Sequence, residues 1–127
     1  MKATIENVRA AVVMDGEERC WRLKKHSSEF LEEMELLAEA HRTNLNLKID
    51  FISQSAHGVD LDASVLYAIN KRIGNMIAMI QRILYERAYP NVPRMAERYG
   101  KNEPALTEDE YKNILAKMGS FCREHKD

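Results

Sequence analysis

The stretch LYAINKRIGNMIAMIQRILYER, residues 66–87, decides the fold of this chain. Its aliphatic residues recur at alternating steps of three and four, so one seam of a helix is apolar over about three heptads. Further apolar residues flank the seam, and a helix that is apolar around most of its circumference is typical of the centre of a bundle. The seam consists of Leu66, Ile69, Ile73, Met76, Ile80 and Ile83, and the flanking residues are Val65, Ala68, Ile77, Met79 and Leu84.

Two long antiparallel helices are predicted around this seam, at residues 28–57 and 62–89. Asp62 can cap the second helix, and Pro90 ends it because proline cannot continue a helix. The two helices would be roughly 45 and 42 Å long. Helices of matched length joined by a short turn pair as an antiparallel hairpin.

A third helix is predicted at residues 107–123. Thr107 and Glu110 form a capping box at its start, in which each side chain can bond the backbone of the other residue. Its apolar residues recur at helical spacing and would pack across the two long helices. The expected fold class is therefore mainly α, a helical bundle in a single domain that spans residues 1–127.

One segment of the first long helix also carries a β pattern. Leu45, Leu47, Ile49 and Phe51 alternate with polar residues, which is the period of a strand. Leu45 and Ile49 equally continue the helical apolar stripe that precedes them. The helical interpretation is favoured because it gives two helices of matched length, and a strand at 45–52 is the alternative.

The N-terminal segment has two interpretations as well. Asp15 and Gly16 are a two-residue hairpin signal between apolar stretches, which would give a β-hairpin at about 8–23. Thr4 and Asp15 can instead cap two short helices. Together with a strand at 45–52, the hairpin would make the fold α+β.

Composition and charge exclude several classes of protein. The chain has 127 residues, of which 45% are hydrophobic and 31% charged, so it is too apolar for wholesale disorder. A formal charge of −1 gives no global attraction to nucleic acid or to a membrane. No apolar run is long enough to cross a membrane, and two distant cysteines are typical of a reducing compartment. We therefore expect a cytoplasmic protein with no membrane partner.

Neither a catalytic nor a ligand-binding signature is present in the sequence. His41 falls on the apolar stripe of the first long helix, where we expect a histidine at the edge of the core that is hydrogen-bonded to a neighbour. Cys20, His26, Cys122 and His125 are the only metal-type set, and zinc binding would require the two chain ends to meet. The sequence thus predicts no catalytic residue, no metal, no cofactor and no small-molecule substrate, and the protein is not expected to be an enzyme.

A polar stripe of the second long helix is the best candidate for a binding face. Cationic groups can hold phosphates while tyrosines stack on bases, as in the binding of single-stranded nucleic acid. The basic segment before the first long helix would extend this surface. The predicted nucleic-acid or partner face comprises Lys71, Arg72, Asn75, Arg82, Tyr85, Tyr89, Arg22, Lys24 and Lys25.

The apolar inventory is generous for one small domain, which favours an interaction protein. We expect a non-enzymatic helical protein that either self-associates as a homo-oligomer or serves as a small subunit or adaptor of a larger protein assembly. A heptad seam shared between chains would supply the interface of an oligomer. The alternative is a small helical subunit of a nucleoprotein complex, which would contact the nucleic-acid backbone through the basic helix face.

Overall fold

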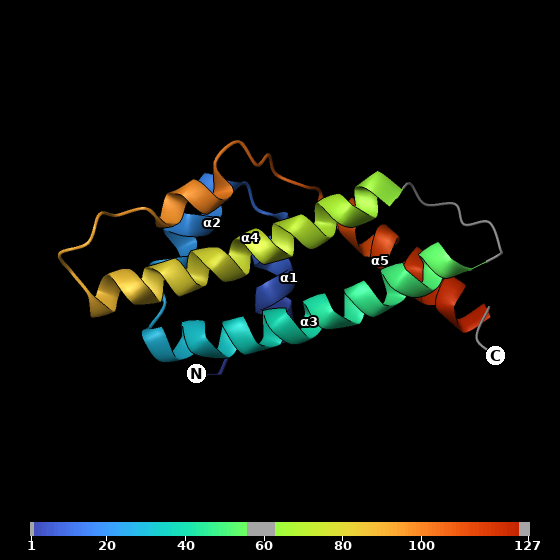
Figure 1. Ribbon diagram of the computed structural model, residues 1–127, viewed down its shortest axis with the longest axis horizontal. Helices are drawn as coiled ribbons and strands as arrows, with labels where there is room; N and C mark the ends of the chain where they lie inside the picture. Colours follow the sequence, from blue (N-terminus) through green and yellow to red (C-terminus); the bar gives the residue numbers. More distant parts are fainter. Residues whose placement is uncertain (1, 56–62, 125–127) are drawn as a thin grey trace.

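The computed structural model describes residues 2–55 and 63–124, which form five α-helices, one 3₁₀-helix and no strand. The long helices α3 (Ser28–Gln54) and α4 (Ala63–Ala88) run antiparallel and side by side (Figure 1). The predicted mainly α fold is therefore confirmed. The remaining elements are α1 (Ile5–Val13), α2 (Gly16–Leu23), the 3₁₀-helix η1 (Ala96–Gly100) and α5 (Glu108–Glu124).

All three predicted helices are present, with ends close to the predicted ones. Ser27 caps α3, because its hydroxyl accepts the backbone N–H of Phe30 at 3.1 Å. Thr107 caps α5 in the same way, at 3.2 Å from the N–H of Glu110. The predicted cap Asp62 and residues 56–57 lie outside the described residues.

The alternative strand at 45–52 is wrong, because these residues continue α3. Leu45 and Ile49 are buried on the stripe that Met34 and Ala38 begin, as a helix requires. Leu47 points to the other side and is 65% exposed. The apparent alternation therefore arises from one buried stripe and one exposed stripe on the same helix.

The alternative β-hairpin at 8–23 is also wrong, since this segment forms α1 and α2. The N–H of Thr4 donates to Oδ1 of Asn7 at 2.8 Å, and the N–H of Glu18 donates to Oδ1 of Asp15 at 2.8 Å. Each cap satisfies a backbone donor that a helix start otherwise leaves without a partner. The segment at Asp15 is consequently a junction of two helices and not a hairpin turn.

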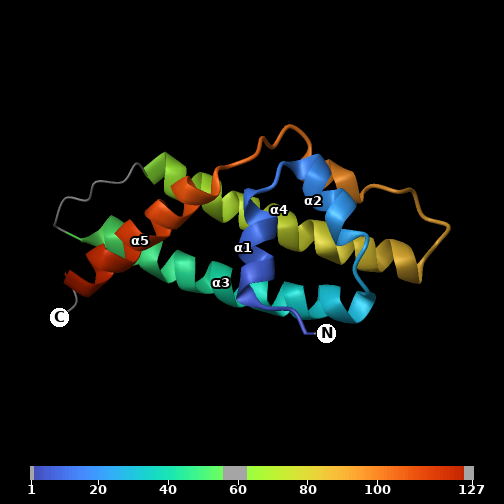
Figure 2. The ribbon, with the colours of Figure 1, turned by 180° about the vertical axis from the view of Figure 1, so that it is seen from behind.

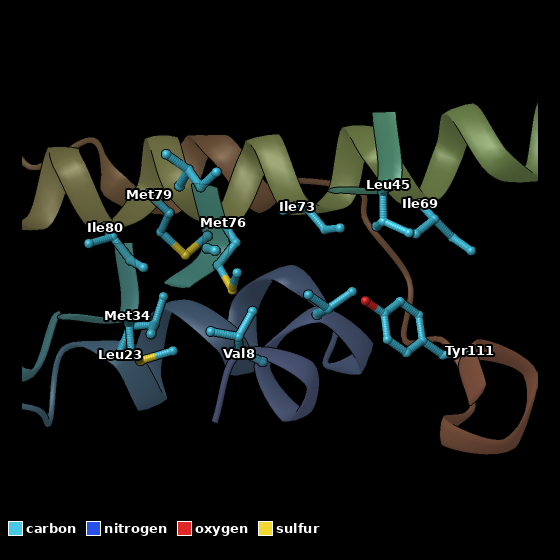
Figure 3. Packing of buried hydrophobic residues seen from close by; sticks show 14 of the residues in the cluster. Val8, Leu23, Met34, Leu45, Ile69, Ile73, Met76, Met79, Ile80 and Tyr111 are labelled. Atoms are coloured by element: carbon cyan, nitrogen blue, oxygen red, sulfur yellow. The ribbon is translucent and has the colours of Figure 1, made fainter. Parts of the chain in front are cut away.

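The heptad seam of α4 lies in the centre of the molecule. Leu66, Ile69, Ile73, Met76, Ile80 and Ile83 are all buried. Figure 3 shows seam residues of α4 facing Met34 of α3, Val8 of α1 and Tyr111 of α5. The seam is therefore buried within one chain, as the prediction of a central helix requires.

The shorter helices cover only one face of the long pair. Helices α1 and α5 pack on one side of α3 and α4, and α2 packs against η1 beside α4 (Figure 2). The approach of α2 to η1 requires glycine, because a Cβ on Gly16 would lie 1.7 Å from the carbonyl oxygen of Gly100. The opposite side of the α3–α4 pair, toward the viewer in Figure 1, carries no further helix of the described residues.

Candidate functional site

The uncovered side of α3 and α4, which we call the outer face, carries exposed apolar side chains on either side of a polar groove. Leu36 and Leu47 of α3 are 69% and 65% exposed, and Tyr67 of α4 is 57% exposed. Soluble proteins rarely leave several large apolar side chains together in water unless the surface has a use. The outer face comprises Leu36, Glu39, Ala40, Arg42, Thr43 and Asn46 of α3 with Tyr67, Lys71, Gly74, Ala78, Gln81, Tyr85 and Tyr89 of α4. Leu47 lies at its edge, where it also borders a hollow with Cys122 of α5.

A groove of about 570 Å³ runs between α3 and α4 in the middle of the outer face. The guanidinium of Arg42 crosses it and donates from Nε to Oδ1 of Asn70 at 3.1 Å. Gly74 provides the space, because a Cβ there would lie 2.9 Å from Nη2 of Arg42. Gln81 bonds Glu35 across the groove at 3.0 Å. The groove therefore has a polar lining between two apolar stripes.

Arginine and tyrosine side chains gather where the end of α4 meets η1. The guanidinium of Arg82 lies 5.0 Å from the ring centre of Tyr85, and the rings of Tyr85 and Tyr89 are 4.9 Å apart. A cavity of about 320 Å³ opens beside Arg82 and is lined by Arg82, Met95, Arg98 and Tyr99. We call Arg82, Tyr85, Tyr89, Arg98 and Tyr99 the basic–aromatic surface; it adjoins the outer face, and Tyr85 and Tyr89 belong to both.

Buried Glu86 holds this surface in place from below. One of its carboxylate oxygens accepts the backbone N–H groups of Met95 and Ala96, which start η1. The same oxygen lies 3.9 Å from Nε of Arg82. Arg82 is also fixed through its donation to the carbonyl oxygen of Pro93 at 2.9 Å. Glu86 thus holds the start of η1, and the carbonyl oxygen of Pro93 holds the guanidinium of Arg82 beside it.

The structure divides the predicted binding face into three parts. Arg82, Tyr85 and Tyr89 lie together on the basic–aromatic surface, and Lys71 is exposed on the outer face. Arg72 and Asn75 instead point into a buried polar network, so they do not belong to a surface that a partner can reach.

The basic residues of α2 form the third part. Nζ of Lys24 lies 3.6 Å from a carboxylate oxygen of Glu97 in η1, which brings α2 next to the basic–aromatic surface. Lys25 lies over the ring of Trp21, with Nζ 3.4 Å from the ring centre, and Arg22 is 3.4 Å from Glu18. These cations are therefore partly engaged within the chain.

The buried polar network joins α1, α2, α4 and the segment after η1. Fully buried Arg19 donates to the carbonyl oxygens of Ala11, Val12 and Met14 at the end of α1. It also pairs with Glu103, at 2.6 Å from Nη2 to Oε1 and 3.1 Å from Nη1 to Oε2. Arg19 thus satisfies carbonyl groups that the end of a helix leaves without partners.

Arg72 and Asn75 complete the network from α4. Arg72 donates to the carbonyl oxygens of Val12 at 3.0 Å, Met14 at 2.9 Å and Pro104 at 2.8 Å. Asn75 donates to Oε2 of Glu103 at 3.1 Å. Burial lowers the pKa of Arg72, an effect that nearby Glu103 opposes. Every strong donor and acceptor here is engaged within the protein, so the network is suited to holding the fold together and not to binding a substrate.

Sequence reasoning did not identify Arg19 or Glu103 as a pair. They are 84 residues apart, and Glu103 lies between helices, where no periodic pattern applies. The ion pair between Arg19 and Glu103 is visible only in the folded structure.

His41 lies at the edge of the core, and its Nε2 is 2.7 Å from the hydroxyl of Tyr111. The predicted hydrogen-bonded histidine at this position is therefore confirmed. Burial is the main reason that the pKa of His41 is lowered, and nearby Arg9 and Lys48 lower it further. Burial also raises the pKa of Tyr111 to about 12. The two neutral groups join α3 to α5.

The two cysteines lie in different helices. Cys20 is buried in α2, where desolvation raises the pKa of its thiol, and Cys122 lies in α5. His26 stacks on Phe30, with ring centres 4.3 Å apart. His125 lies outside the described residues, and within residues 2–55 and 63–124 no three histidine, cysteine or acidic side chains are placed to hold a metal ion.

Comparison of the chain with protein-family models, curated proteins and solved structures finds no match. Among the helices that the structure describes, none is long and apolar enough to span a membrane. The candidate functions therefore depend on the surfaces of the molecule itself.

Proposed function

We propose that this chain is a non-enzymatic interaction protein that binds another protein through the outer face of α3 and α4. The observation that carries the proposal is the exposure of Leu36, Leu47 and Tyr67 along two helices that the other helices of residues 2–55 and 63–124 leave uncovered on this side. Burial of such side chains would supply the free energy of binding, and the charges around them would select the partner.

The size of the outer face suits a protein partner. Two helices of this length, about 40 Å, side by side present roughly 800 Å², which equals the share of one partner in an interface of standard size. The groove between them is open and polar, with Glu39, Arg42 and Asn46 in its lining. Such a lining is less suited to a small apolar ligand, which prefers an enclosed cavity.

Site-specific photo-cross-linking tests the proposal. A benzophenone amino acid at position 47 would lie on the outer face, and one at position 112 of α5 would be an exposed control on another side of the molecule. After irradiation of cells that produce the protein, we expect a protein adduct from position 47 and none from position 112. Equal yields from both positions, or no adduct from position 47, would contradict the proposal.

The basic–aromatic surface supports a second candidate function, contact with the backbone and bases of single-stranded nucleic acid. Arg98 extends from η1 beside the cavity, and its only hydrogen-bond contact among the described side chains is the sulfur of Met95 at 3.9 Å. Tyr85, Tyr89 and Tyr99 are at least 42% exposed, so their rings are accessible for stacking.

Fluorescence anisotropy with a labelled single-stranded oligonucleotide tests this candidate. Binding through phosphates should weaken steeply between low and moderate salt, and Arg98→Glu should remove most of it. Lys112→Glu on α5 is the matched control, since it makes the same charge change elsewhere. Binding that is unaffected by Arg98→Glu would exclude this surface. Arg72 is not a suitable position for such a test, because its replacement would break the buried network.

A further inference from the structure

We propose that the partner on the outer face is a second copy of this chain, related by a two-fold axis that runs along the groove between α3 and α4. The inference rests on the proposed function and adds the identity and orientation of the partner. Rotation about this axis places α3 of each copy over α4 of the other, in antiparallel orientation. The four long helices then form a bundle in which every neighbouring pair is antiparallel.

Contacts within one chain define which residues would meet across the interface. Ser28 bonds Arg87 at 3.0 Å, and Glu35 bonds Gln81 at 3.0 Å, so the start of α3 is level with the end of α4. Arg42 is likewise level with Gly74 near the middle. An axis parallel to the helices preserves these levels, so each α3 residue would meet α4 of the second copy at the same height.

Charge is complementary across this arrangement. Glu29 and Glu32 are exposed at the start of α3, and Arg82 and Arg98 lie beside the end of α4. Figure 1 shows these two parts at the same end of the molecule. The two-fold axis would bring the acidic start of each α3 to the basic–aromatic surface of the other copy, and the pairing would occur twice.

The shapes of the side chains also agree with the axis. Ala40 and Thr43 would lie at the level of Ala78 and Gly74 of the second copy, and the guanidinium of Arg42, which lies over Gly74 of its own chain, would be part of the interface. Toward the other end, Leu47 would meet Tyr67 of the second copy and both would lose exposure to water. Because the same surfaces face each other, the contact closes as a dimer and does not propagate into a filament.

The same charges argue against a nucleic acid as the occupant of the outer face. A strand that contacted Arg82 and Arg98 and continued over the outer face would run past Glu29, Glu32 and Glu39, which would repel its phosphates. A second copy instead supplies Arg82 and Arg98 opposite Glu29 and Glu32.

Charge reversal tests the dimer without requiring knowledge of any other partner. One variant carries Glu29→Lys and Glu32→Lys, and the other carries Arg98→Glu. Each variant alone would place like charges together twice, so we expect its dimer dissociation constant to rise more than about tenfold. In the mixed dimer of an equimolar mixture, one contact is that of the unmodified chain, and the other sets the two introduced lysines against the introduced glutamate beside Arg82. We therefore expect the mixture to dimerise more tightly than either variant alone.

Sedimentation velocity of each sample reads out the result. Recovery in the mixture also shows that both variants are folded, and Lys112→Glu on α5 is the control that should leave the dimer unchanged. Variants that remain dimers alone, a mixture that stays monomeric, or a larger species that nuclease removes would each overturn the inference. If the unmodified chain is a monomer while position 47 still cross-links to a different protein, the proposed function stands and the second copy is excluded. If the chain is a monomer and position 47 gives no cross-linked adduct, both the second copy and the proposed function are excluded.

Discussion

Glu103→Gln should destabilise the fold far more than its small change in size suggests. The carboxylate of Glu103 accepts from Arg19 and Asn75 and lies 3.4 Å from Nε of Arg72, and all of these contacts are buried or partly buried. An amide keeps the shape but removes the negative charge between two guanidinium groups. It also places an NH₂ group where a carboxylate oxygen of the unmodified protein accepts hydrogen bonds from Arg19 or Asn75.

The expected loss of stability follows from the burial of the pair. The side chain of Arg19 is fully buried and that of Glu103 is 9% exposed, so solvent screens their interaction little. Breaking a buried ion pair by removing one charge costs about 3–5 kcal/mol, and the retained amide oxygen should reduce this to about 3 kcal/mol. For a chain of this size, such a change lowers the melting temperature by about 10 °C.

Urea unfolding followed by circular dichroism at 222 nm measures this loss, with melting curves as a second readout. Glu97→Gln is the matched control, because Glu97 is half exposed in its pair with Lys24 and should contribute less than about 1 kcal/mol. If Glu103→Gln costs no more than Glu97→Gln, the buried network does not stabilise the fold as argued.

Gly16→Ala should lower the free energy of unfolding by about 3 kcal/mol or more, because the new Cβ would overlap the backbone of Gly100. Gly119→Ala in α5 is the control for the same urea titration. It should be neutral or stabilising, because the nearest group is the flexible end of an arginine. Tyr111→Phe should cost about 1 kcal/mol, since it leaves the partly buried Nε2 of His41 without its partner; a loss in the free energy of unfolding below about 0.3 kcal/mol would show that the bond does not stabilise the fold. Because the pKa of His41 is lowered in the folded state, the unfolded chain binds more protons as the pH falls below about 6.5. The unmodified protein should therefore lose more stability between pH 7.5 and 5.5 than His41→Gln does, and equal losses would contradict the lowered pKa.

The helices could be predicted from the sequence because the capping residues and the spacing of the apolar residues indicate the same helix starts. Thr4, Asp15, Ser27 and Thr107 are all suitable caps, and each stands at the start of a helix in the structure. The ambiguity at 45–52 arose because two helical stripes, one buried and one exposed, together imitate the alternation of a strand. Only the packing of Leu45 against the other helices distinguishes the two.

The candidate surfaces were less predictable, since helical spacing does not say which polar side chains are buried. Arg72 and Arg82 are both arginines on α4, yet Arg72 enters the core toward Glu103 while Arg82 lies at the edge of a surface cavity. That difference depends on where the segment after η1 crosses α4, which is a contact between distant parts of the chain. The cavity beside Arg82 could not be predicted for the same reason, because its lining residues Arg98 and Tyr99 come from η1 and not from α4.

The central claim, that a second copy covers the outer face, is tested most directly by the mass of the unmodified protein in solution. Light scattering over a series of concentrations should give a mass near twice 14.7 kDa at the higher concentrations, falling toward 14.7 kDa on dilution. The sample should scatter identically before and after nuclease treatment. A mass of 14.7 kDa at every concentration would contradict the claim.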